Sequence, residues 1–313
     1  MNRGVVTTPW GVWKQPQRAR VRLHWAVMSK ENAGGKLIAP NRCCSDARCR
    51  LLEPVPKSFS GAIPGWLGDL AGAWVFYSVL PAWPGVPPRF ERIARFAPLI
   101  GLVLGGLQGL FWWLAAGWLP LGAQVALALA LGLVLTGGLH VDGAMDTADG
   151  LGAGPRALEA MADSRVGASG VQALVVVLLI KAAALLCLGA AAPLAMLWAA
   201  FWGRVSPLLA MQWFPYLRQQ GSAAFHRQHW RGLAAELVPA LLVFALALGL
   251  AAWTRWPWPQ GLGLLPAVLV PLWLGRRLGG HSGDSYGACV EWTEALALLL
   301  MALLLGLWPR LAA

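Results

Sequence analysis

The feature that most constrains this chain is a series of apolar stretches, each about 20 residues long, which runs from Gly65 towards the C-terminus. A helix of that length crosses the hydrocarbon core of a bilayer, because each residue adds about 1.5 Å of rise. Hydrophobic residues make up 58% of the chain and charged residues only 12%, and the mean hydropathy is +0.57. Lipid is therefore the expected solvent.

Seven stretches are candidates for membrane-spanning helices. They are Pro98–Trp118, Leu121–Leu139, Val171–Ala190, Pro193–Phe214, Leu233–Trp253, Gly261–Leu274 and Ala288–Trp308. The segment Gly65–Pro81, which is rich in aromatic residues, is expected to lie in the interface or to re-enter the bilayer. The predicted fold is all-α, a polytopic transmembrane helical bundle with about seven spans.

Residues 1–60 differ in kind, because they are basic, interrupted by Gly and Pro, and without sustained apolar periodicity. Such a composition cannot bury a core. We expect a disordered basic tail, a transit peptide or a mis-called gene start with Met28 as an internal candidate. Residues 61–313 are predicted to form one integral membrane domain.

The net charge of +11 does not indicate nucleic-acid binding, because much of the excess lies in the first sixty residues and in short loops. Lys and Arg in short loops mark the cytoplasmic side. The opposite loops hold only Arg255 and Arg310. The basic loops hold Arg89, Arg92, Arg95, Arg156, Arg165, Arg218, Arg227, Arg231, Arg276 and Arg277. The same loops hold the polar motifs, HVDGAMDTADG, MADSRVG, YLRQQGSAAFHRQHWRG and LGGHSGDSYGA, which are expected to form one site.

Three aspartates in HVDGAMDTADG stand at helical spacing. At about 100° per residue, Asp142, Asp146 and Asp149 project from one face of a helix. No basic residue in the run neutralises them, so a divalent cation is the expected partner, and oxygen ligands favour Mg²⁺ or Mn²⁺. Asp163 is expected to complete the metal site. The alternative is an acidic loop that is merely solvated at the membrane boundary.

Metal-dependent chemistry on a phosphate is the sharper hypothesis. Under it, the guanidinium groups that hold phosphate oxygens are those of Arg165, Arg204, Arg218 and Arg227. Lys181 and Arg204 lie within predicted spans, where an ionisable group is costly, so we expect both in or under the site rather than snorkelling.

The remaining ionisable residues have less specific interpretations. His140 and His281 either act as general bases or bind substrate, or only brace loops, and both alternatives stay open. His226 and His229 are expected to be solvated. Favourable electrostatics near helix N-termini explain three glutamates at the cytoplasmic ends of spans, Glu236, Glu291 and Glu294.

Four motifs in order resemble the cobalamin synthase family, adenosylcobinamide-GDP ribazoletransferase. HVDGAMDTADGL is similar to the family's acidic motif, and LEAMADSRVGASGVQALVVVLLIK to its DSR stretch that ends in Lys. FYSVLPAW with RFAPLIGLVLGG is similar to the N-terminal stretch. GGHSGDSYGA with EWTEAL is similar to the C-terminal GG-x-TGD-x-x-GA, with Ser282 in place of threonine. The resemblance runs from about Trp66 to the end.

The resemblance implies a Mg²⁺-dependent phosphotransferase of the inner membrane in the last assembly step of vitamin B12. Members join adenosylcobinamide-GDP to α-ribazole or its 5′-phosphate and release GMP, forming adenosylcobalamin or its 5′-phosphate. Expected partners are these substrates, membrane lipid and other cobalamin-assembly enzymes, but not nucleic acid.

Combining this resemblance with the residues above predicts two sets of site residues. The catalytic set is Asp142, Asp146, Asp149, Asp163, Arg165 and His140, with the four aspartates as Mg²⁺ ligands. The substrate-binding set is Ser164, Lys181, Arg204, Arg218, His281 and Asp284.

Two alternatives compete with this interpretation. A CDP-alcohol phosphotransferase also uses aspartates and Mg²⁺, but that family has an Ala-Arg pair and a later G-x-x-x-D-x-x-x-D, and neither follows Gly143. An ion-coupled transporter would use Lys181, Arg204 and the carboxylates as an ion or proton path. The transporter interpretation predicts polar groups near the midplane of the membrane, whereas the polar motifs of this chain lie on one side. Inverted repeats, which many transporters contain, are not evident in the sequence.

Overall fold

The computed structural model describes residues 63–218, 223–254 and 260–311. All regular structure in these ranges is helical, apart from one isolated bridge between Tyr216 and His281. The predicted all-α class is confirmed. Residues 1–60, for which the sequence predicts a disordered tail, lie outside the described residues.

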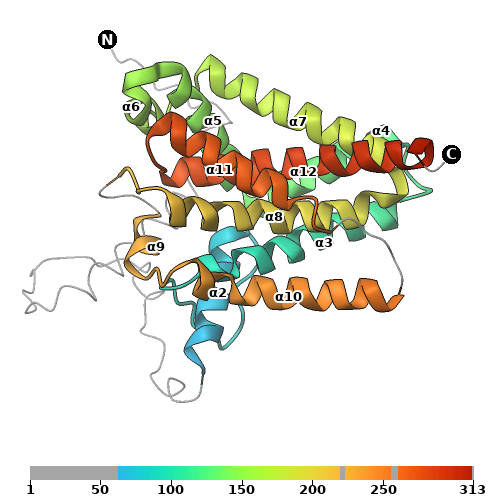
Figure 1. The fold of residues 1–313 in the computed structure, drawn as a ribbon, viewed down its shortest axis with the longest axis horizontal. Helices are drawn as coiled ribbons and strands as arrows, with labels where there is room; N and C mark the ends of the chain where they lie inside the picture. The colour runs from blue at the N-terminus through green and yellow to red at the C-terminus, as the bar shows by residue number, and fades with distance from the viewer. Residues whose placement is uncertain (1–62, 219–222, 255–259, 312–313) are drawn as a thin grey trace, which may run out of the picture. The chain divides into compact units, whose positions relative to one another are not determined.

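The helices follow one another along the chain as shown in Figure 1. They are α2 (Gly65–Tyr77), α3 (Ala97–Ala115), α4 (Leu121–Thr136), α5 (Leu139–Ala153), α6 (Ala157–Ala162), α7 (Ala168–Leu188), α8 (Ala192–Trp213), α9 (Ala224–Gln228), α10 (Leu233–Thr254), α11 (Leu264–Leu278) and α12 (Gly283–Leu311).

Several helical stretches within the described ranges are long and apolar enough to cross a membrane. Four pass by length and composition, namely Ala94–Ala115, Ala168–Trp213, Leu233–Trp253 and Gly283–Leu305. A fifth is added if α4 and the segment 139–162, which are bent by 92°, count as one span. α4 has 16 residues, and α11 has 15 with Pro271 inside. The predicted number of about seven spans is therefore only roughly supported.

The stretch Ala168–Trp213 contains two helices that fold back on each other. Lys181 in α7 and Arg204 in α8 both bond to the carboxylate of Glu294. A straight helix would place these two residues about 35 Å apart. The chain therefore reverses between α7 and α8, at the short turn Gly189–Ala191.

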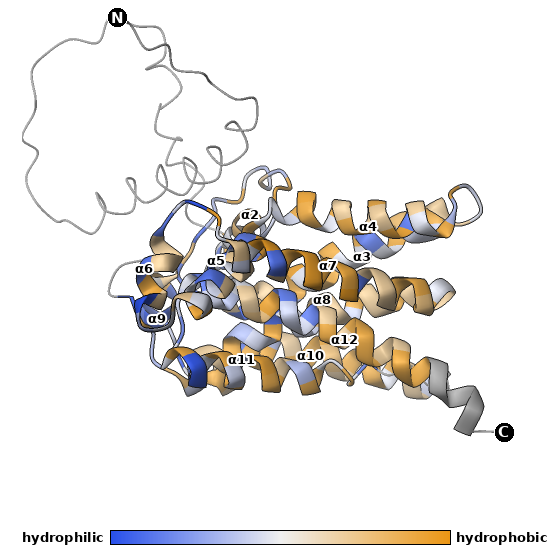
Figure 2. Ribbon diagram, turned by 90° about the horizontal axis from the view of Figure 1, so that it is seen from above, coloured by the Kyte–Doolittle hydropathy of each residue, from blue (hydrophilic) through white to orange (hydrophobic). Residues whose placement is uncertain are grey.

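Hydrophilic residues gather at one end of the helices. Figure 2 shows them around α5, α6 and α9, whereas the long helices are mostly hydrophobic along their length. Arg156 and Arg165 flank α6, and Arg227 lies in α9. Arginines of the basic loop set thus lie at this polar end.

The central helix is α8, most of whose residues are buried. α3 packs against it through glycines, because a Cβ added at Gly105 would lie 2.6 Å from the carbonyl oxygen of Met196. A Cβ added at Gly101 would lie even closer to the carbonyl oxygen of Ala200. Such close backbone contact through small residues is the usual way in which helices associate in lipid.

A second glycine contact fixes α5 against α12. A Cβ at Gly143 would lie 2.5 Å from the carbonyl oxygen of Asp284, and a Cβ at Gly287 would lie 2.9 Å from that of His140. Because the two backbones touch, only hydrogen fits at these positions. The contact sets the position of the acidic helix α5 relative to the start of α12.

Replacing Gly143 by alanine is expected to destabilise the protein by roughly 1–3 kcal/mol, because the methyl group forces α5 away from α12. The control is Gly106→Ala in α3, where the nearest atom lies 3.9 Å from the added Cβ. That variant is expected to be neutral or slightly stabilised, because alanine favours helix. Thermal unfolding of both purified variants in detergent makes the comparison. Equal melting temperatures would contradict the close contact.

Candidate active site

The acidic motif forms one continuous helix, α5, which begins after a pair of glycines. Gly137 and Gly138 have φ values of 60° and 75°, a left-handed conformation that glycine adopts without strain. They allow the 92° bend between α4 and the segment 139–162, which begins with α5. In α5, Asp142 is exposed and Asp146 is half-buried. The predicted helical spacing of the aspartates is confirmed.

Asp149 ties α5 to the start of α7. Its Oδ2 accepts a hydrogen bond from the Gly167 N–H at 2.8 Å, and its Oδ1 accepts one from the Gly170 N–H at 2.7 Å. The first N–H groups of a helix have no partner within the helix, and a negative charge there is favourable. A Cβ at either glycine would collide with this carboxylate. Asp149 therefore caps α7 from a neighbouring helix.

Two loops come together beside α5. The Leu217 N–H donates to the His281 carbonyl at 2.7 Å, and the His281 N–H donates to the Pro215 carbonyl at 2.9 Å. These bonds join the loop after α8 to the loop before α12. They place Arg218 Nη2 2.9 Å from Asp284 Oδ2.

Asp284 also faces α5. Its backbone touches Gly143, and the negative charges of Asp142 and Asp284 act on each other. We call Asp142, Asp284 and Arg218 the carboxylate–arginine group. Because its members come from α5, the start of α12 and the loop after α8, three separate sequence motifs meet in it.

His281 braces the loop before α12. Its Nε2–H donates to the Pro271 carbonyl at 3.1 Å, and its Nδ1 lies 3.0 Å from Ser285 Oγ. The ring has no exposed surface, and burial lowers the pKa of His281 to about 4, so the ring is neutral. Of the two alternatives that the sequence leaves open, the structure favours the brace over substrate contact.

The DSR triplet lies between α6 and α7 and is more exposed. Arg165 Nη2 lies 2.6 Å from Asp163 Oδ2, and this hydrogen bond lowers the pKa of Asp163 to about 2. The Arg165 side chain is 87% exposed, and Ser164 is exposed as well. Asp163 thus has Arg165 as its partner instead of completing a cluster with the aspartates of α5.

The predicted set of four Mg²⁺ ligands is not gathered in this structure. Within 63–218, 223–254 and 260–311, no three or more His, Cys, Asp or Glu side chains lie close enough to hold a metal ion. Asp149 and Asp163 are bonded elsewhere. Asp142 and Asp284 fit better, because Mg²⁺ often binds through one or two carboxylates together with substrate phosphates. Mg²⁺ binding itself stays a prediction.

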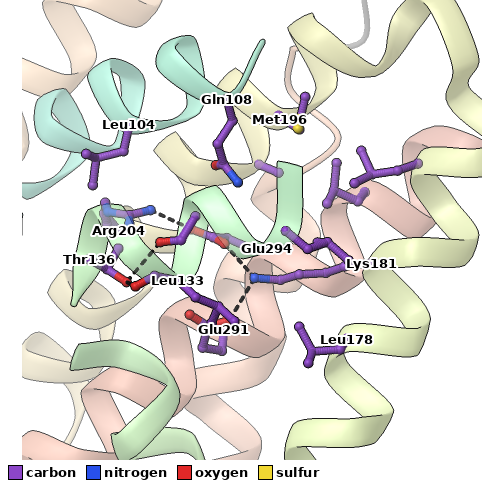
Figure 3. A pocket seen from close by; sticks show the side chains of 15 residues that line it. Leu104, Gln108, Leu133, Thr136, Leu178, Lys181, Met196, Arg204, Glu291 and Glu294 are labelled. Carbon is purple, nitrogen blue, oxygen red and sulfur yellow. Dashed lines mark hydrogen bonds and ion pairs between the residues drawn. The ribbon is translucent and has the colours of Figure 1, made fainter. Parts of the chain in front are cut away.

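Lys181 and Arg204 belong to a buried ionic cluster with Glu291 and Glu294. Lys181 Nζ lies 2.7 Å from an oxygen of each glutamate, and Arg204 Nη1 lies 2.5 Å from Glu294 Oε1. Figure 3 shows the four side chains converging from α7, α8 and α12. Two cations and two carboxylates balance, which is the arrangement expected of charges in a membrane interior.

His140 lies between this cluster and the exposed part of α5. The residue is 4% exposed, and its ring stacks on Tyr77 at 6.4 Å between ring centroids. The charges of Arg204 and Glu294 act on it. Its Nδ1 has no hydrogen-bond partner among the described residues. His140 is therefore placed beneath the site rather than on its surface.

The interpretation of the glutamates as residues near helix N-termini is wrong for two of them. Glu291 and Glu294 lie beyond the second turn of α12, which begins at Gly283. Glu236 does lie in the first turn of α10, but it also accepts a bond from Arg92 Nη2 at 2.7 Å. The signal that indicates their role is the presence of Lys181 and Arg204 in apolar spans. A cation there needs an anionic partner, and the glutamates supply it.

The expectation of a solvated loop holds for His229, which is exposed, but is wrong for His226. The His226 ring packs against Phe76 and Phe225, and burial lowers the pKa of His226 to about 3. No pattern in the sequence indicates that Phe76 of α2 contacts α9.

The fold and the site define a class: a helical membrane protein whose carboxylate–arginine group lies at its polar end. The chain belongs to the cobalamin-5-phosphate synthase family, which matches residues 69–302. This confirms the family that the motifs predicted.

Named relatives agree with this assignment. The chain is 61% identical over 256 residues to the adenosylcobinamide-GDP ribazoletransferase of Prochlorococcus marinus (strain MIT 9303), covering 77% of this chain and 98% of the relative. It is 43% identical over 251 residues to that of Thermosynechococcus vestitus, covering 77% and 96%. No solved structure matches the chain.

Proposed function

We propose that the protein transfers the adenosylcobinamide phosphate moiety of adenosylcobinamide-GDP to α-ribazole or its 5′-phosphate. The products are GMP and adenosylcobalamin or its 5′-phosphate, in the final assembly of vitamin B12. The names of the relatives support this reaction. The observation that carries it is the carboxylate–arginine group, because two carboxylates and a guanidinium suit the handling of a diphosphate.

In the proposed reaction, an oxygen of the ribazole attacks the phosphorus next to the corrin side chain. The bond from that phosphorus to the bridging oxygen breaks, and GMP leaves with the electron pair. Asp142 and Asp284 would hold Mg²⁺, which when bound neutralises charge on the diphosphate. Arg218 holds phosphate oxygens through its planar donors. A carboxylate of α5 that does not hold Mg²⁺ would take the proton of the attacking hydroxyl, rather than the buried His140.

We also propose that the polar end faces the cytoplasm and that the helices lie in the inner membrane. The support is the concentration of arginine in the loops at that end. Substrates that are water-soluble would then reach the carboxylate–arginine group without entering the hydrocarbon.

The test incubates purified membranes that contain the protein with adenosylcobinamide-GDP and α-ribazole, with and without Mg²⁺. Chromatography follows GMP and adenosylcobalamin, which are expected in equal amounts and only with Mg²⁺. Asp142→Asn is expected to lower kcat/KM by roughly 100-fold or more. This is the usual loss of rate when an enzyme loses one group that stabilises charge in the transition state. Parallel reactions replace α-ribazole by its 5′-phosphate.

The control is Glu91→Gln, because Glu91 is exposed and pairs with Arg89 away from the carboxylate–arginine group. It should retain wild-type activity. Folded wild-type protein that forms neither product with either acceptor would contradict the proposed transfer, and CDP-alcohol substrates would be assayed next. Wild-type activity in Asp142→Asn would remove this residue from the site.

A further inference from the structure

A cleft of about 790 Å³ opens beside the acidic helix, between the segment α5–α6 and α11. Its volume lies in the range of roughly 300–1,000 Å³ that small-molecule sites occupy. Its lining begins at Gly150, one helical turn after Asp146. The cleft thus continues from the same helix that carries the carboxylates of the proposed active site.

The side chains that line the cleft combine three kinds of chemistry. Arg156 and Arg277 supply two guanidinium groups, and Glu159 supplies a carboxylate. The Trp273 indole is 54% exposed, and the Arg277 guanidinium lies 5.8 Å from its ring centroid. The cleft is therefore lined by two cations, one exposed aromatic ring and one carboxylate, which can only accept hydrogen bonds.

This combination fits a guanine nucleotide. Guanidinium groups bind phosphate oxygens in forked pairs, and exposed aromatic rings stack on nucleobases. A carboxylate accepts two hydrogen bonds at once. The Watson–Crick edge of guanine offers two adjacent donors, one of them the amino group on C2. Adenine offers no such pair of donors on that edge, so a carboxylate favours guanine over adenine.

We propose that the cleft binds the guanosine part of the activated corrin substrate, with Trp273 stacked on guanine and Glu159 on its Watson–Crick edge. Arg156 and Arg277 hold phosphate oxygens. This inference rests on the proposed function. From Gly150 to Asp142 the distance along α5 is about 12 Å, so the diphosphate of a nucleotide in the cleft extends along α5 towards the carboxylate–arginine group.

The experiment measures equilibrium binding of GMP and AMP to the full-length protein in detergent, by dialysis against radiolabelled nucleotide. GMP should bind roughly tenfold or more tightly than AMP. Trp273→Ala should weaken GMP binding roughly tenfold or more, because stacking on the base is lost. It should raise KM for adenosylcobinamide-GDP to a similar extent while kcat and KM for α-ribazole stay unchanged.

Glu159→Gln tests base recognition separately. It should bring the affinities for GMP and AMP close to each other. The glutamine amide has only one acceptor oxygen, so its NH₂ group would face the second N–H donor of guanine instead of accepting from it. The matched controls are Trp113→Ala, which removes a 69% exposed tryptophan from α3, and Glu91→Gln. Both should bind GMP as the wild type does.

The outcomes separate this inference from the proposed function. If the wild type performs the transfer but Trp273→Ala and Glu159→Gln bind GMP like the controls, the cleft is not the nucleotide site. Equal affinity of the wild type for GMP and AMP also overturns the inference. If GMP binds with the expected preference and cleft variants lose it, the inference is supported even where no transfer to α-ribazole occurs.

Discussion

Replacing Lys181 by methionine is expected to lower the free energy of unfolding by roughly 3–5 kcal/mol, the usual cost of breaking a buried ion pair. The side chain is buried, and its ammonium contacts both Glu291 and Glu294. Without it, two carboxylates inside the helix bundle share the charge of Arg204 alone. Thermal unfolding of the purified variant in detergent measures the loss.

A second substitution distinguishes lost charge balance from lost packing. In Lys181→Met with Glu291→Gln, one cation and one anion are removed together, so much of the lost stability should return. Glu291→Gln alone should cost less than Lys181→Met, because Lys181 keeps Glu294 as its partner. A double variant no more stable than Lys181→Met would show that the balance of charge does not set the stability of this cluster.

Replacing Asp149 by asparagine is expected to lower both stability and turnover without changing the Mg²⁺ requirement. The amide keeps one acceptor, so one of the N–H groups of Gly167 and Gly170 loses its partner, which costs roughly 1–3 kcal/mol. The start of α7 and the adjacent DSR loop would then shift, and kcat should fall. The Mg²⁺ concentration for half-maximal activity should equal that of the wild type.

Asp142→Asn provides the comparison. If Asp142 holds Mg²⁺, its loss should raise the Mg²⁺ concentration that is needed for half-maximal activity. Asp149→Asn and Asp142→Asn therefore separate a capping residue from a metal ligand. A raised Mg²⁺ requirement in Asp149→Asn would return this aspartate to the metal site that the sequence predicts.

The sequence predicted the family, the helical class and the meeting of separate polar motifs. Those predictions depended on local signals. Apolar length identifies membrane helices, and the spacing of Asp142, Asp146 and Asp149 predicts one helix whether or not its neighbours are known. Arginine-rich loops placed the motifs on one side. The contact of Arg218 with Asp284 agrees with that placement, although the sequence does not predict this pair.

Predictions failed where a partner comes from a distant helix. Glu291 and Glu294 were separated from Lys181 by 110 or more positions, and no local pattern states which helices are neighbours. Asp149 resembles its two companions in sequence, yet the backbone N–H groups of α7 occupy both of its oxygens. A carboxylate that caps a helix and one that faces solvent look alike until the fold is known.

The right-angle bend after α4 has a consequence for access. If α4 stands across the bilayer, then the segment 139–162, which contains α5 and α6 and is bent by 92° from α4, runs along the membrane surface. The aspartates would then lie on a shelf at the boundary between lipid and water. A large corrin could settle on such a shelf from the aqueous side and leave by the same route. No opening between the transmembrane helices would be required, and turnover should be insensitive to the acyl-chain composition of the surrounding lipid.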